Sequence, residues 1–129
     1  MTTYKFEPYN ILDETVPVFT KKGAGESFKY ISIKFKNGKV FKGHNIFDNY
    51  VRAIYYIGLD KAAKIAYYYN INSGGAPIIS RKIEPKWTKK YKSFELEGYH
   101  ILKIKANSYR ALLNRLSETY DLGIKVELL

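Results

Sequence analysis

The sequence has no cysteine and only two histidines among its 129 residues. Without cysteine, disulfide bonds, thiolate zinc sites, iron–sulfur clusters and cysteine nucleophiles are excluded. His44 and His100 lie far apart in the sequence, and two histidines are too few for most histidine-based metal sites. We therefore expect a protein of a reducing, cytoplasmic compartment that uses no metal and no cofactor.

Long apolar runs are also absent from the sequence. No segment approaches the roughly 18 to 20 apolar residues that a membrane-spanning helix requires. The N-terminal sequence MTTYKFEPYNILDE lacks the basic and apolar regions of a secretory signal. The sequence thus predicts neither a membrane segment nor export.

Acidic residues are few relative to basic ones, since 22 Lys and Arg stand against 12 Asp and Glu and give a formal charge of +10. Such an excess of positive charge attracts polyanions. Nucleic acid is the commonest partner of a small basic protein of this kind, and we expect it here. A lysine-rich surface that only keeps the protein soluble is the alternative.

Residues 1–27 have no sustained hydrophobic period. They end in TKKGAGES, a Gly- and Ser-containing segment that is typical of a linker. We interpret them as an N-terminal arm. Residues 28–129 are long enough for a single domain with its own core.

Hydrophobic periodicity predicts the elements in the first half of that domain. Residues 30–36 alternate between apolar and polar side chains, as in a half-buried strand. Asn37-Gly38 predicts a two-residue hairpin turn, after which the chain returns as a second strand. Asn45 is expected to cap a helix that ends at Gly58, and a shorter helix follows. Its expected apolar stripe is Leu59, Ala62, Ala63, Ala66 and Tyr69.

The second half is predicted to contain three further strands and one helix. The strands cover residues 76–80, 99–105 and 124–128. Asn107 or Ser108 is expected to cap the helix that precedes the last strand. The pattern predicts an α+β domain whose small, mostly antiparallel sheet combines the N-terminal hairpin with three later strands, packed with about three helices.

A basic segment is the strongest indication of function. Residues 81–92, RKIEPKWTKKYK, carry six Lys or Arg side chains, a single Glu and the only Trp of the chain. Lysine and arginine neutralise phosphates and release counterions, while an indole ring stacks on a base. The alternative is a solvated basic loop that Trp87 anchors to the core.

Two other segments are expected to lie beside it. Residues 103–110 connect a predicted strand to a predicted helix N-terminus, where free N–H groups and the helix dipole favour an anion. Residues 72–75 form a Gly-Gly loop with small polar side chains. If the three segments converge, their basic, aromatic and small polar side chains form one binding face. The expected nucleic-acid contacts are Asn72, Ser73, Arg81, Lys82, Lys86, Trp87, Lys89, Lys90, Lys103, Lys105, Asn107, Ser108 and Arg110.

The segments GGAPIIS (residues 74–80), GYHI (98–101) and LGIKVE (122–127), together with the capped helix, carry a resemblance. The layout resembles a small module at the ends of bacterial restriction- and modification-associated proteins. It is also distantly similar to the C-terminal DNA-binding domain of the replication-sequestration protein SeqA. The resemblance implies a bacterial or phage module that acts in restriction, modification or replication control, and it favours double-stranded DNA over RNA as the partner. Because the sequence contains no convincing catalytic constellation, we expect this module to be non-enzymatic.

The sequence departs from that pattern at two places. Arg81 and Lys82 follow the glycine-led strand, whereas the SeqA domain has arginines around it. Asn107 and Ser108 stand where that domain has an Asn/Thr-rich turn. Recognition of hemimethylated sites is therefore not implied.

Two other functions stay open. In the first, the hairpin edge or the Tyr-rich helices dock a larger enzyme, or a second copy of the chain, through an exposed apolar patch. In the second and weaker one, the protein is a Mg²⁺-dependent nuclease. Glu84-Pro85-Lys86 has the acidic-x-Lys spacing of such enzymes, with Glu95 and Glu97 as further carboxylates, but a proline disfavours the strand that this motif requires.

Overall fold

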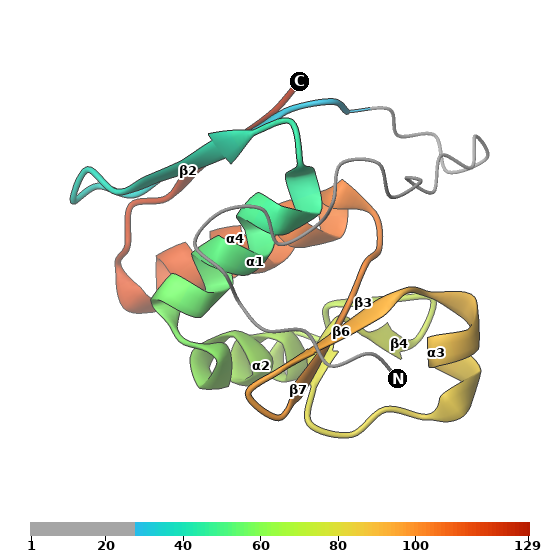
Figure 1. The fold of residues 1–129 in the computed structure, drawn as a ribbon. Helices are drawn as coiled ribbons and strands as arrows, with labels where there is room; N and C mark the ends of the chain where they lie inside the picture. The colour runs from blue at the N-terminus through green and yellow to red at the C-terminus, as the bar shows by residue number, and fades with distance from the viewer. Residues whose placement is uncertain (1–27) are drawn as a thin grey trace.

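The computed structural model describes residues 28–129, so the predicted N-terminal arm, residues 1–27, lies outside the described part (Figure 1). Residues 28–129 form four helices and eight short strands, which confirms the predicted α+β class. In chain order the elements are β1 (Ile31–Lys34), β2 (Val40–Gly43), α1 (Ile46–Ile57), α2 (Leu59–Tyr68), β3 (Asn72–Ser73), β4 (Ala76–Pro77), β5 (Ile79–Ser80), α3 (Pro85–Lys90), β6 (Ser93–Leu96), β7 (Tyr99–Leu102), α4 (Ala106–Tyr120) and β8 (Lys125–Leu128).

The strands form three small antiparallel sheets among the described residues, and the prediction of one sheet was wrong in this respect. Their orders are β2-β1-β8, β3-β4 and β5-β7-β6. The last strand joins the first, with Ile33 opposite Val126. Alternating side chains specify which face of a strand is buried but not which distant strand lies beside it. The pairing of β1 with β8 therefore depends on tertiary packing, which local periodicity does not reveal.

Figure 1 shows α1 and α4 between the β2-β1-β8 sheet and the β5-β7-β6 sheet. The two helices meet through Tyr50 and Tyr109, whose rings stack at 4.0 Å between centroids. Phe47 on α1 packs against Phe94 on β6, with 5.3 Å between their ring centroids. This contact connects the helix layer to the second three-stranded sheet. One continuous cluster of buried apolar side chains therefore runs through the described residues.

Helix α1 begins and ends where the sequence predicts. The Asn45 side chain accepts a hydrogen bond from the Asp48 N–H at 3.1 Å, and the Gly58 N–H donates to the Ile54 carbonyl. These contacts satisfy backbone groups that the helix itself leaves without partners. Gly58 has a φ of 126°, which favours glycine over any other residue.

The N-cap of helix α4 lies two or three residues before the predicted one. Lys105 is its N-cap residue and makes no side-chain capping bond, so Asn107 and Ser108 lie in the first turn instead. The Tyr109 hydroxyl accepts the Ile104 N–H at 2.8 Å and thereby holds the segment before the helix. This contact depends on the position of Tyr109 in the core, which the local sequence does not reveal.

Two turns also differ from the prediction. The β1–β2 hairpin is confirmed, but its loop has three residues, because the Phe35 N–H bonds the Lys39 carbonyl and only Gly38 has a positive φ. The predicted Gly-Gly loop is itself a hairpin in which Gly74 and Gly75 form the two-residue turn between β3 and β4. The predicted strand over residues 76–80 is accordingly divided between β4 and β5.

Candidate nucleic-acid interface

The basic segment after β5 contains helix α3, which the sequence pattern did not predict. Pro85 occupies its first position, where the missing N–H costs nothing, and the Trp87 N–H donates to the Glu84 carbonyl at 2.9 Å. The Tyr91 N–H closes the turn on the Trp87 carbonyl at 2.8 Å. Six residues are too few for an isolated helix to be stable, so α3 depends on what it packs against.

Helix α3 docks on the β3–β4 hairpin through its two aromatic residues. The indole of Trp87 lies over Gly75, where an added Cβ would sit 3.7 Å from the ring. The Tyr91 hydroxyl lies 3.3 Å from the Ser73 hydroxyl. Two of the three predicted segments, residues 72–75 and 81–92, are thus brought together. Trp87 serves partly as an anchor and keeps part of its surface exposed.

Three lysines share one face of α3. Lys86, Lys89 and Lys90 are exposed and are spaced three and four residues apart, which places them side by side on a helix. Lys86 pairs with Glu84 at 3.5 Å. Lys89 and Lys90 have no carboxylate partner among residues 28–129. Like charges at this spacing repel, and the face therefore favours an anionic partner.

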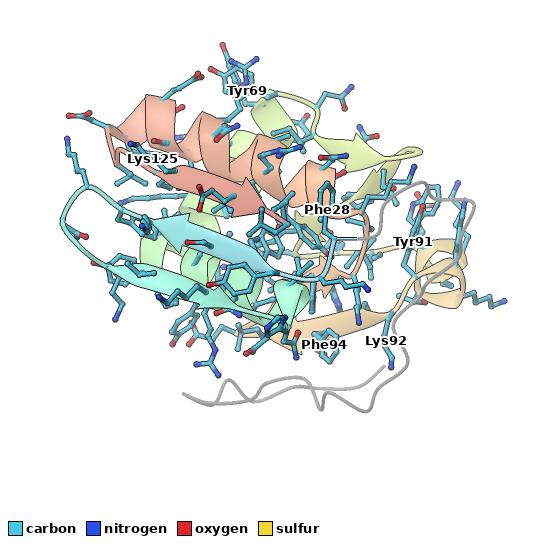
Figure 2. The ribbon with its side chains drawn as sticks, turned by 90° about the horizontal axis from the view of Figure 1, so that it is seen from above. Phe28, Tyr69, Tyr91, Lys92, Phe94 and Lys125 are labelled. Carbon is cyan, nitrogen blue, oxygen red and sulfur yellow. The ribbon has the colours of Figure 1, made fainter. Side chains whose placement is uncertain are left out.

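The remaining predicted segment, residues 103–110, meets the end of the basic segment at Lys103. The Lys103 N–H donates to the Lys92 carbonyl at 2.8 Å, just beyond the last β6–β7 pair. Figure 2 shows Tyr91 and Lys92 leaving the end of α3 in opposite directions. Lys103 is half-buried, and burial together with the charge of Lys92 lowers the pKa of its ammonium group. Lys105, Asn107, Ser108 and Arg110 lie further along, and Arg110 donates to the Asn107 side chain.

We expect Lys103→Met to stabilise the protein slightly. Because the pKa of Lys103 is lower in the folded state than in the unfolded chain, its charged form destabilises the folded protein at pH 7. This destabilisation disappears when the pH rises above 10.5, the usual pKa of a lysine, because the side chain is then neutral in both states. Thermal unfolding at pH 7 should shift upward by about 1 to 3 °C. The gain should shrink toward pH 11. Lys105→Met, at an exposed position, should leave the midpoint unchanged, and an equal shift in both variants would contradict the explanation.

Arg81 does not lie on the lysine face of α3. Its guanidinium pairs with Asp60 of α2 at 3.5 Å and stacks over the Tyr99 ring at 4.3 Å. The Tyr99 hydroxyl also donates to Asp60, and this hydrogen bond raises the pKa of Tyr99. Lys82 is exposed beside it, and its carbonyl accepts from the Ser80 hydroxyl. Asp60 and Tyr99 therefore hold Arg81, and its expected contact with nucleic acid stays a prediction.

Arg81 lines a groove of about 550 Å³ that the sequence pattern did not predict. Helix α2 forms one wall, with Lys64 and Tyr67 at its rim, and residues 77–81 form the other. Asn72 and Gly75 line the groove as well. Lys64 and Tyr67 lie outside the predicted apolar stripe of α2, and that is the signal that could have identified them.

The carboxylates of the nuclease alternative have separate structural roles. Glu84 precedes α3 instead of lying on a strand, and Glu97 occupies the turn between β6 and β7, where it accepts from the Tyr55 hydroxyl at 2.8 Å. Within residues 28–129, no three His, Cys, Asp or Glu side chains are grouped so that they could hold a metal ion. In the same range, no helix is long and apolar enough to cross a membrane.

Comparisons with known proteins add no functional assignment. No protein family model matches the chain, and neither the search of curated proteins nor that of solved structures found a match. The resemblance to the SeqA domain and to restriction-associated modules therefore stays a prediction. The case for a function rests on the geometry of the site.

Proposed function

We propose that this protein is a non-enzymatic nucleic-acid-binding module whose main contact surface is α3 with the segments that border it. The observation that carries the proposal is the row of exposed Lys86, Lys89 and Lys90 on one face of α3. Lys92 and Lys103 follow that helix and lie close enough for the charge of one to act on the other. Clustered lysines bind phosphates by releasing condensed counterions, and this gives affinity without sequence preference.

The neighbouring side chains support contacts to more than phosphate. Trp87 and Tyr91 lie at the edge of the lysine face with 6.5 Å between ring centroids. An aromatic ring beside a cationic row is the arrangement that stacks on bases while lysines follow the backbone. Asn72 and Ser73, at the hairpin under α3, add small polar groups of the kind that contact phosphate or base edges.

The context of this activity is part of the proposal. The absence of cysteine suits a cytoplasmic location. The resemblance stated above favours DNA and a role in bacterial or phage restriction, modification or replication control. Neither point affects the contact surface itself.

Trp87 allows a direct test because it is the only tryptophan of the chain. Nucleic acid added at low salt should change its fluorescence, and log K should fall linearly with log salt. We expect Lys89→Gln to reduce the magnitude of that slope by about 1, as for the loss of one phosphate contact. Absence of binding to any DNA or RNA at low salt would overturn the proposal.

A protein-docking role is the second candidate, and the β2 edge favours it. Val40 and Tyr56 are exposed there, and Tyr56 packs on Phe41 with 5.7 Å between ring centroids. Strand β2 is an outer strand of its sheet, and its other edge pairs with no strand of residues 28–129, so a further strand could add there. This candidate predicts tight binding to a protein partner that added salt barely weakens.

A further inference from the structure

The groove beside α2 continues onto the α3 surface. Gly75 lines the groove and also lies under the Trp87 indole. Asn72, another lining residue, bonds the Gly75 N–H through its side-chain oxygen at 3.0 Å and so holds the hairpin turn that separates the two surfaces. A flexible chain that follows the α3 lysines can therefore pass over the β3–β4 hairpin into the groove.

The groove has the size and lining of a site for a flat ring. Its volume of about 550 Å³ lies within the range of pockets that hold small ligands. Small apolar side chains, among them Ala63 and Ala66, line it next to Ile78 and Ile79. Such a surface accepts the face of a planar group without a hydrogen-bond requirement.

The rim supplies an aromatic ring and positive charge. Tyr67 has an exposed fraction of 90%, the largest among the large hydrophobic side chains of the described residues, and it lines the groove. Lys64 lies one helical turn before it and has no carboxylate partner within residues 28–129. Arg81 adds a second cation, although Asp60 offsets part of its charge.

We propose that this groove binds an unpaired nucleotide of a single-stranded nucleic acid whose neighbouring phosphates lie on the α3 lysines. The inference rests on the proposed function and names its substrate class. A duplex keeps its bases paired and stacked and offers only their edges, so it cannot place a base in the groove. Unpaired bases stack on tyrosine and on arginine, and the charges at the rim suit the attached phosphates.

The test compares oligothymidine and oligouridine of about 12 nucleotides with a blunt duplex at low salt. Trp87 fluorescence reports binding at α3, and fluorescence anisotropy of the labelled oligonucleotide gives the affinity. We expect the single strands to bind about tenfold more tightly than the duplex. Equal or tighter binding of the duplex would overturn the inference and leave the proposed function intact.

Two pairs of variants test the groove itself. Tyr67→Ala should weaken single-strand binding about tenfold, whereas Tyr68→Ala should not, because Tyr68 is also exposed but does not line the groove. Lys64→Glu should weaken it similarly, whereas Lys61→Glu, on the same helix but outside the groove, should have a much smaller effect.

The results separate the two proposals. If the wild type binds and both members of each pair bind alike, the groove assignment is wrong and binding at α3 stands. If the wild type binds neither single strands nor duplex, the proposed function fails, and the groove assignment fails with it. Circular dichroism of all four variants checks that the exposed substitutions leave the fold unchanged.

Discussion

The double variant Lys89→Glu, Lys90→Glu is expected to lose nucleic-acid binding by about 100-fold at low salt. If α3 is the contact surface that we propose, each substitution removes a phosphate contact and places a repelling carboxylate on the same helix face. Both side chains are exposed, so the fold should persist. The measurement is a titration of labelled oligonucleotide against variant and wild type at two salt concentrations, and the salt dependence should fall together with the affinity.

Lys34 and Lys125 provide the matched control. They are exposed, lie opposite each other on β1 and β8, and can be reversed with the same change in net charge. Figure 2 shows Lys125 on the other side of the molecule from Tyr91 and Lys92. The control pair should reduce affinity only a few-fold, through the overall charge. An equal loss in both pairs would indicate diffuse attraction and contradict a contact surface at α3.

Elements whose ends depend on neighbouring residues could be predicted from the sequence. Asn45 and Gly58 delimit α1 because a cap acts within one turn of the chain. Helix α3 could not be predicted in the same way. Its stability comes from Trp87 and Tyr91 packing on a hairpin that is distant from them in the sequence. The division of the strands into three sheets is likewise a matter of tertiary packing.

The candidate site was predictable in its charges but not in its shape. The lysines of α3 and the residues of the β3–β4 hairpin were identified, and the hairpin does lie under the helix. Arg81 was grouped with them because it is close in sequence, whereas β5 and β7 direct it toward Tyr99. The groove has one wall from α2 and the other from β4 and β5, and only folding brings these walls together.

Tyr109→Ala is expected to cause the largest loss of stability. Tyr109 is 2% exposed, stacks on Tyr50, and accepts the Ile104 N–H through its hydroxyl. Removing a buried aromatic ring costs about 3 to 5 kcal/mol, and leaving the N–H of Ile104 without its partner adds to this. Because a domain of this size has a total stability of about 5 to 15 kcal/mol, chemical denaturation should show a much lower midpoint.

Two Phe variants separate the ring from its hydroxyl. Tyr109→Phe keeps the stack but loses the bond to Ile104, and we expect it to cost about 1 to 3 kcal/mol. Tyr50→Phe should be neutral or stabilising, because the Tyr50 hydroxyl is buried without a hydrogen-bond partner among the described residues. Equal effects of the two variants in urea denaturation would contradict this assignment.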